Sequence, residues 1–141
     1  MKNEFVPYDT ALALKGLGFD EPCFAGYSED ENGSRLCLMN ILSDGLLINA
    51  EDEDCECLAP TYSQAFRWFR DKYNMYCPIM PADLGKYEEG NPDFQAGIYT
   101  REPVDVESLN TFKTYEEAEL ACLKKLIEII NQNKDDKAPE N

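Results

Sequence analysis

The sequence predicts an α+β fold, in which a single domain holds an antiparallel sheet of about four strands with helices on one face. Two segments that open with a helix-capping sequence and carry an apolar stripe predict two of the helices. Short apolar runs bounded by Gly, Pro and Asn predict pairs of strands. The expected order is α-β-β-α-β-β-α. The chain of 141 residues has the size of one domain. We expect that domain over residues 1–130, with a polar, flexible tail over 131–141.

The central helix is predicted between Ala59 and Tyr73. Thr61, followed three residues later by Gln64, fits a capping box, which marks where the helix begins. At 100° per residue, four aromatic side chains fall on one side of this helix and predict a face that packs into a core. They are Tyr62, Phe66, Phe69 and Tyr73.

The N-terminal part is predicted to form a helix followed by a β-hairpin. Asp9 can cap the helix, and Gly18 can end it in the left-handed conformation that glycine tolerates. Asn32 and Gly33 favour a chain reversal between the first two strands. The predicted strands cover residues 23–27, 35–42 and, as a third short strand, 46–48.

Two further strands and a long helix are expected in the C-terminal half. The strands are predicted over residues 75–80 and 94–100. Pro78 cannot donate a ladder hydrogen bond, so the first of them should lie at an edge or carry a bulge. Residues 101–113 are predicted to be a polar connector. Thr114 and Glu117 form a second capping box, which opens a helix that extends to about Ile130.

The openings of the two capped helices share the pattern Thr-Tyr-x-x-Ala, beginning at Thr61 and at Thr114. A duplicated β-β-α unit would explain the shared pattern. The alternative is that a favourable helix opening arose twice. The predicted architecture is the same in both cases.

The charge of the chain argues against several kinds of ligand. There are 28 acidic and 13 basic residues, for a formal charge of −15. Binding to phosphate backbones or to anionic membranes requires clustered Lys and Arg, so we expect no direct nucleic-acid binding and no membrane association. The N-terminal segment has no apolar export signal. These features predict a cytoplasmic protein.

The residue types also argue against an enzyme. The chain has no histidine, which removes the usual general base and the commonest metal ligand. No Gly-rich phosphate loop and no Gly-x-Ser-x-Gly sequence is present. Adjacent acids such as Glu116 and Glu117 are typical of a solvated helix start. We therefore expect neither catalytic residues nor a cofactor.

The cysteines are expected to be reduced because the chain lacks an export signal. Several should serve as small core residues. Cys55-x-Cys57 could supply two thiolates to zinc, but structural zinc sites normally combine two closely spaced pairs, and no second pair exists. We expect no metal. The six cysteines are Cys23, Cys37, Cys55, Cys57, Cys77 and Cys122.

Two features are candidates for an interaction surface. The first is an acidic loop formed by Glu51, Asp52, Glu53, Asp54 and Glu56, which does not match a calcium-binding EF-hand because the required Gly and bidentate acid are missing. We interpret it as a solvated loop. The second is Trp68 between Arg67 and Arg70, a composition typical of interaction hot spots. The alternative, which we favour, is that Trp68 forms a second packing layer against the C-terminal helix or a loop.

Three segments of the chain resemble small uncharacterised proteins encoded in phages and prophages of gut anaerobic bacteria. The segments span 4–24, with the sequences EFVPY and GFDEPCF at its ends, 65–70 with AFRWFR, and 114–121 with TYEEAELA. The family has no assigned activity, so the resemblance implies no catalytic residues. It implies a product that works inside a bacterial cell, where small acidic phage proteins can act as inhibitors of host machinery.

Together these observations predict a non-enzymatic, acidic protein-interaction module with a protein partner. One alternative is a DNA-mimicking inhibitor of a host nuclease or regulator, in which carboxylates along one face imitate phosphates. Another is a thiol-dependent enzyme, which would need a cysteine of low pKa near Lys or Arg.

Overall fold

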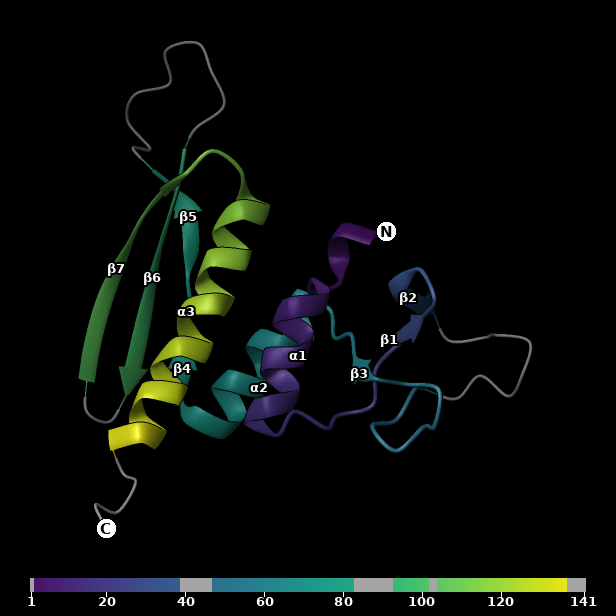
Figure 1. Ribbon diagram of the computed structural model, residues 1–141. Helices are drawn as coiled ribbons and strands as arrows, with labels where there is room; N and C mark the ends of the chain where they lie inside the picture. The colour runs from purple at the N-terminus through teal and green to yellow at the C-terminus, as the bar shows by residue number, and fades with distance from the viewer. Residues whose placement is uncertain (1, 39–46, 83–92, 102–103, 137–141) are drawn as a thin grey trace. The chain divides into compact units, whose positions relative to one another are not determined.

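The computed structural model describes residues 2–38, 47–82, 93–101 and 104–136. The chain divides into two compact units, Met1–Ala65 and Phe66–Asn141. The α+β class and the alternation of helices with antiparallel strands are confirmed (Figure 1). The strands belong to two sheets, one of three strands and one of four, where we expected a single sheet.

The first unit combines helix α1 with the three-stranded sheet. A short 3-10 helix, Lys2–Glu4, precedes α1, which covers Tyr8–Leu17. The sheet has the order β2-β1-β3, and both neighbouring pairs are antiparallel. Its strands are β1 (Ala25–Asp30), β2 (Gly33–Leu38) and β3 (Cys57–Leu58).

The predicted hairpin is confirmed, with a tighter turn than we expected. Asp30 pairs with Gly33, so only two residues connect β1 and β2. Gly33 has a φ of 104°, and the backbone N–H of Asn32 donates to Asp30 Oδ1 at 2.8 Å. These local bonds let polar residues that we assigned to the turn continue the strands.

The prediction of a third strand at 46–48 was wrong in position, because Ile48 makes only an isolated bridge with Cys23 and β3 supplies the third strand. Leu46 and residues 39–42 of the second predicted strand lie outside the described residues.

Helix α1 ends as predicted but begins differently. Its N-cap is Pro7, and Asp9 lies in the first turn, where its Oδ1 accepts a bond from the backbone N–H of Thr10. The expected cap by Asp9 was therefore wrong. At the other end Gly18 has a φ of 95°, and the N–H of Phe19 donates to the carbonyl of Leu14. Gly18 thus provides the left-handed C-terminal turn.

A buried cluster of the first unit lies on one face of its sheet. Ala25 packs with Phe5 and Ala59 in a buried cluster, and Tyr27 packs against it. The Tyr27 hydroxyl donates to the carbonyl of Val6 at 2.8 Å. Because successive residues of a strand point to opposite faces, Ala25 and Tyr27 face this core. Gly26 and Ser28 consequently belong to the opposite face.

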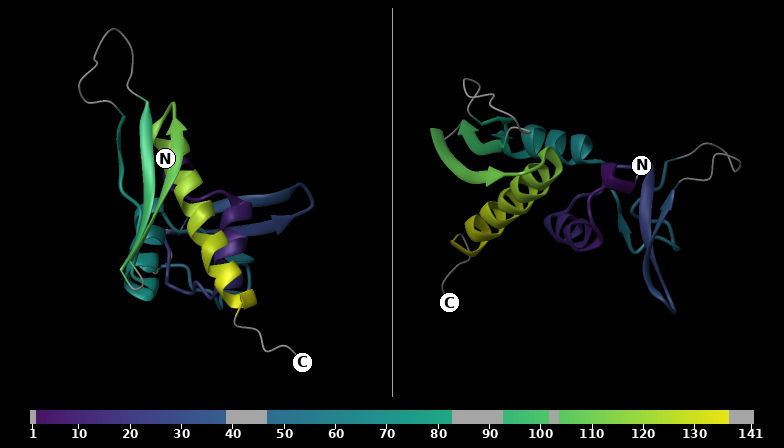
Figure 2. Two further views of the ribbon diagram at one scale, coloured as in Figure 1. Left: turned by 90° about the vertical axis from the view of Figure 1, so that its left-hand side faces the viewer. Right: turned by 90° about the horizontal axis from the view of Figure 1, so that it is seen from above.

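The second unit combines most of helix α2, residues Tyr62–Tyr73, with a four-stranded sheet and helix α3. Strand β6 is central: β7 pairs along one edge, and β4 and β5 pair in succession with the other. Helix α3 lies along one face of this sheet (Figure 1, Figure 2). The elements after α2 are β4 (Met75–Tyr76), β5 (Ile79–Pro81), β6 (Phe94–Arg101), β7 (Val104–Phe112) and α3 (Tyr115–Asp136).

Several expectations for this half need correction. Residues 101–113 are not a polar connector, because Val104–Phe112 forms β7 and pairs with β6. The predicted strand at 75–80 is interrupted at Cys77 and Pro78, as expected from the missing proline N–H. Helix α3 continues beyond Ile130 to Asp136, so the polar segment begins as helix.

Both predicted capping boxes hold their helices by a side-chain bond. The backbone N–H of Gln64 donates to Thr61 Oγ1 at 3.2 Å, and that of Glu117 donates to Thr114 Oγ1 at 3.1 Å. The boundaries of α2 and the start of α3 therefore agree with the sequence prediction.

The core of the second unit joins α2, α3 and the sheet. Ala96 of β6 packs with Ala118 and Cys122 of α3, and Phe66 of α2 packs against the same cluster. Phe66 of the predicted α2 stripe thus packs on the same cluster as α3, which is the part of the expected shared face that the packing shows. Leu123 and Leu126 of α3 are fully buried.

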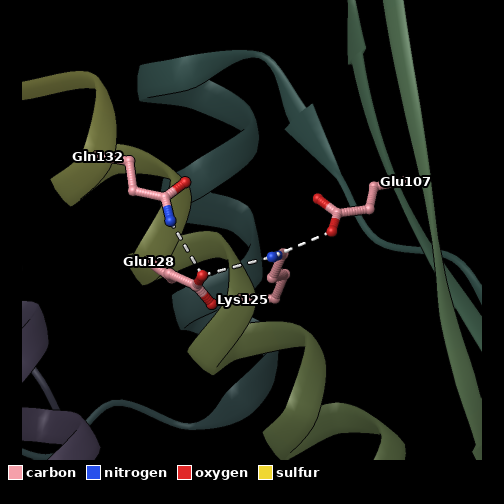
Figure 3. Close-up of polar contacts among 4 residues, drawn as sticks. All are labelled: Glu107, Lys125, Glu128 and Gln132. Carbon is pink, nitrogen blue, oxygen red and sulfur yellow. Dashed lines mark hydrogen bonds and ion pairs between the residues drawn. The ribbon is translucent and has the colours of Figure 1, made fainter. Parts of the chain in front are cut away.

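A polar contact also links α3 to the sheet. Lys125 Nζ lies 3.0 Å from Glu107 of β7 and 3.5 Å from Glu128 one turn along the helix (Figure 3). Gln132 Nε2 donates to the same Glu128 carboxylate at 3.0 Å. The hydrogen bond with Glu107 is the main reason that the pKa of Lys125 is raised. This contact adds to the packing of Leu109 and Phe112 of β7 on the cluster that includes Ala118 and Cys122 of α3.

The expectation that all cysteines are reduced was wrong for one pair. Cys77, between β4 and β5, forms a disulfide with Cys122 of α3. The two residues are 45 positions apart, and no local spacing pattern predicts such a bond. Disulfides persist mainly in oxidising compartments, so the inference from a missing export signal to reduced thiols does not hold for this pair. Within the described residues, no helix is long and apolar enough to cross a membrane.

Replacing Leu126 tests the packing of α3. Leu126→Ala should lower the free energy of unfolding by about 2–5 kcal/mol, because a fully buried side chain is replaced by a cavity. Lys124→Ala, at an exposed position of the same helix, should change it by less than about 0.5 kcal/mol. Deleting the chain after Gln132 should also have little effect, because Asn133 and the residues up to Asp136 are exposed. Urea denaturation measures all three, and a truncation as damaging as Leu126→Ala would contradict the assignment.

Reduction tests the disulfide. Dithiothreitol should lower the free energy of unfolding by about 2–4 kcal/mol, because the bond closes a loop of 45 residues in the unfolded chain. The double variant Cys77→Ser with Cys122→Ser should show a loss of at least this size and no further change on reduction. A wild-type protein whose denaturation curve does not respond to the reductant would contradict the bond.

Candidate functional site: an acidic pocket in the first unit

The candidate site is a pocket of about 880 Å³ on the face of the three-stranded sheet opposite the core. The sheet forms one wall of the pocket, which we call its sheet side. Its residues are Gly26 and Ser28 of β1 and Arg35 and Cys37 of β2. These residues share one face, because Gly26 pairs with Cys37 and Ser28 with Arg35 across the hairpin. The other lining residues are Tyr27, Glu29, Ile48, Asp52, Glu53, Asp54, Cys55 and Glu56.

The acidic loop forms the second wall of the pocket and is held by backbone bonds. The N–H of Asn49 donates to Asp52 Oδ2 at 2.8 Å, and the N–H of Cys55 donates to the carbonyl of Asp52 at 2.9 Å. The N–H of Glu56 donates to the carbonyl of Tyr27 and joins the loop to β1. Four of the five predicted loop acids line the pocket, while Glu51 is exposed and does not.

Glu56 has an unusual environment in this wall. Its Oε1 accepts a bond of 2.6 Å from the Tyr8 hydroxyl, and its backbone carbonyl accepts one from Lys15 Nζ at 2.5 Å. The bond to Glu56 is the main reason that the pKa of Tyr8 is raised to about 12. Glu56 Oε2 is buried and has no hydrogen-bond partner among the described residues. A buried carboxylate oxygen without a partner is costly.

The lining of the pocket is strongly acidic. Arg35 is its single basic residue, against five carboxylates. The carboxylates come from β1 and from the loop, so they surround the pocket from two sides. They belong to Glu29, Asp52, Glu53, Asp54 and Glu56. Such a concave surface attracts cations and repels anions.

Burial makes Cys23, Cys55 and Cys57 poor nucleophiles. Burial is the main cause that raises the pKa of Cys55, and it raises the pKa of Cys57 to about 11 and that of Cys23 to about 12. Lys15 acts in the opposite direction on Cys55 and Cys57 but is outweighed. These shifts weigh against a thiolate catalyst at neutral pH. Cys23 and Cys57 are buried and serve as small core residues, as expected. In the described part of the chain no group of three or more His, Cys, Asp or Glu side chains is arranged to hold a metal.

The predicted surface around Trp68 is not an exposed aromatic patch. Trp68 is only 5% exposed and packs edge to face on Phe69 and Tyr73, with ring centroids 5.2 and 5.5 Å apart. Lys72 Nζ lies 4.8 Å from the centre of the indole. The burial of Trp68 agrees with the favoured packing role, although these ring and cation contacts lie within α2 itself. Arg67 and Arg70 are exposed on the same helix.

A second, smaller hollow of about 150 Å³ lies on the second unit. Tyr99 of β6 and Val106 of β7 pair across the strands there, and both are exposed. The hollow has no charged lining residue and no unpartnered polar group. It therefore offers fewer specific contacts than the acidic pocket.

Sequence reasoning found the acids of the pocket but missed its sheet side. Gly26 was the available signal, since a glycine within a strand often marks a close approach of another segment. An ideal Cβ on Gly26 would lie 2.8 Å from Cys55 Sγ, so the absent side chain makes room for that thiol. The positions of Arg35 and Cys37 follow from the register of the tight hairpin, which the sequence analysis did not predict.

Comparisons with protein-family models, curated proteins and solved structures found no significant match to this chain. The resemblance to phage and prophage proteins therefore stays a prediction.

Two glycine substitutions test the architecture of the pocket. Gly26→Ala should destabilise the protein by about 1–3 kcal/mol, because the new methyl group displaces Cys55 Sγ. Gly16→Ala in α1 should stabilise it by about 0.5–1 kcal/mol, because no atom lies within 4 Å and alanine favours helix. Thermal and urea denaturation measure both changes.

A double-mutant cycle identifies the cause of the stability loss in Gly26→Ala. In a Cys55→Ala background, Gly26→Ala should lose most of its effect, since the atom that it contacts is gone. An equal loss in both backgrounds would show that Cys55 does not lie over Gly26.

Proposed function

We propose that the protein is a non-enzymatic interaction module that binds a Lys- or Arg-rich segment of a partner protein in the acidic pocket of its first unit. The resemblance to phage and prophage proteins suggests that the partner is a host protein in the bacterial cytoplasm. The lack of histidine and the raised pKa values of Cys23, Cys55 and Cys57 support a binding role over a catalytic one.

The unpartnered Glu56 Oε2 carries the proposal. The Tyr8 hydroxyl already occupies Oε1, so the carboxylate is fixed in place and presents a buried second oxygen. A Lys ammonium or an Arg guanidinium donates charge-assisted hydrogen bonds that would satisfy it. An anionic or apolar ligand would leave the oxygen without a donor. The chemistry of this atom therefore selects a cationic side chain.

The other acids of the pocket contribute attraction at longer range. Glu29, Asp52, Glu53 and Asp54 add negative charge around the entrance, with Arg35 as the single opposing charge of the lining. Charges of this kind increase the rate of association with a basic segment and contribute less to its final affinity. The salt dependence of binding should thus come mainly from these four residues, and the specificity from Glu56.

The alternative classes have weaker support. A DNA-mimicking inhibitor needs carboxylates in a regular array along one face, whereas described acids occur on elements as different as α1, β1, β7 and α3. A thiol-dependent enzyme needs a cysteine of lowered pKa, and the shifts of Cys23, Cys55 and Cys57 have the opposite direction.

Calorimetric titration with an unstructured peptide of alternating Lys, Arg and Ser tests the proposal. The wild-type protein should bind the peptide, and Glu56→Gln should weaken binding by about tenfold, the value of one charge-assisted hydrogen bond. Tyr8→Phe should retain binding, because it frees one oxygen of Glu56 and leaves its charge. Thermal melts of each variant establish that it is folded.

Two triple variants that remove the same number of charges distinguish binding in the pocket from an effect of overall charge. Asp52→Asn, Glu53→Gln and Asp54→Asn remove three charges at the pocket. Asp71→Asn, Glu116→Gln and Asp135→Asn remove three exposed charges of the second unit. Only the first set should reduce binding and its dependence on salt. Equal reductions by both sets would contradict the pocket and favour charge-based mimicry.

A further inference from the structure

Cys37 and Cys55 meet on the same part of the sheet face. Cys37 pairs with Gly26 across β1 and β2, so its side chain lies on the face to which Gly26 belongs. Side chains of such paired positions start about 4.5–5.5 Å apart. Cys55 Sγ occupies the space directly above Gly26, 2.8 Å from where a Cβ would stand. The missing side chain of Gly26 therefore places the two thiols next to each other.

Both of these thiols can be reached from the pocket, unlike the other cysteines. Cys37 and Cys55 are half-buried and line the pocket. Cys23 and Cys57 are only 1% and 3% exposed, and Cys57 pairs with Tyr27, which places it on the core face. Cys77 and Cys122 are bonded to each other. A small oxidant that enters the pocket thus meets one specific pair of free thiols.

We propose that Cys37 and Cys55 are an oxidation site, at which a hydroperoxide or a small-molecule disulfide converts the two thiols into a disulfide across the floor of the pocket. This pair is chosen because Cys37 pairs with Gly26 in the hairpin and because Cys55 Sγ lies directly above Gly26. The bond would fix the acidic loop to β2. The assignment concerns the thiols themselves and does not depend on the proposed binding of a basic segment.

The chemistry balances with a hydroperoxide as the oxidant. The Cys37 thiolate attacks the terminal peroxide oxygen, the O–O bond breaks, and an alcohol or water leaves after it gains a proton. The sulfenic acid on Cys37 is then attacked by Cys55 Sγ, which forms the S–S bond and releases water. Two thiols lose two protons and two electrons in total, and the peroxide is reduced. With a small disulfide, the same two steps pass through a mixed disulfide and release two small thiols.

Cys37 is assigned the first attack because of its hydrogen-bond partner. Ser28 Oγ lies 3.2 Å from Cys37 Sγ, and a hydroxyl in this position can donate to a thiolate. Cys55 has no comparable hydroxyl contact in the described part of the chain, and burial raises its pKa. Cys55 therefore acts as the resolving thiol.

Mass spectrometry of the full chain after oxidation tests the site. The native protein is treated with hydrogen peroxide or oxidised glutathione, alkylated without reduction, and cleaved before aspartates, which separates Cys37 from Cys55. The Cys37–Cys55 linkage should dominate, and the free thiols should fall from four to two per chain while Cys77–Cys122 persists. Cys57→Ser should give the same linkage, which excludes Cys57 as the partner.

Two variants and oxidation in urea test whether the folded protein directs the reaction to Cys37 and Cys55. Cys55→Ser should stop the reaction at a dimedone-reactive sulfenic acid on Cys37, and Gly26→Ala should slow formation of the linkage because it displaces Cys55. Protein oxidised in urea should give mixed pairings. The proposal is overturned if the native protein keeps four free thiols, if Cys37 bonds to Cys23 or Cys57, or if native and unfolded protein give the same mixture.

Discussion

The alternation of side chains along β1 is the constraint on which the first unit depends. Ala25 and Tyr27 point into the core, where Tyr27 bonds to Val6 and packs on the same cluster as Phe5. The residues between them must then face the other way. One of these is Gly26, and its missing side chain leaves room for the acidic loop to approach the sheet. A register shift of one residue would exchange the two faces and remove both the core and the pocket.

The same alternation explains what the sequence could and could not predict. Both capping boxes and Gly18 were predicted correctly, because their bonds join residues close in sequence. Strand β7 was missed although Val104 and Val106 alternate with Asp105 and Glu107, because the alternation stops at Ser108 and most of the segment is polar. Its Glu107 finds its partner Lys125 on α3. Such a contact depends on packing between distant segments.

The candidate site was predictable only in part for a similar reason. Four of its five acids lie within the acidic segment from Glu51 to Glu56, so they stood out in the sequence, whereas Glu29 of β1 did not. The sheet side depends on how β2 pairs with β1, and the tight turn at Asn32 sets a register that the sequence pattern alone did not specify. The bond between Cys77 and Cys122 likewise needs the packing of α3, since the residues are 45 positions apart. The sequence pattern thus identified chemical groups, and the tertiary structure decided which of them meet.

The charge of the pocket also connects its two proposed activities. After burial, Asp52 is the next cause that raises the pKa of Cys55, because a thiolate beside a carboxylate is repelled. A basic side chain bound next to Glu56 would act in the opposite direction, as Lys15 already does on Cys55. Bound peptide would therefore stabilise the thiolate of Cys55 relative to the thiol and favour its attack on an oxidised Cys37. Peptide binding and ionisation of Cys55 are linked. The free energy by which bound peptide stabilises the thiolate equals the free energy by which the thiolate strengthens peptide binding. Oxidation removes that negative charge and fixes the loop, so the disulfide form should hold the peptide less tightly than the thiolate form.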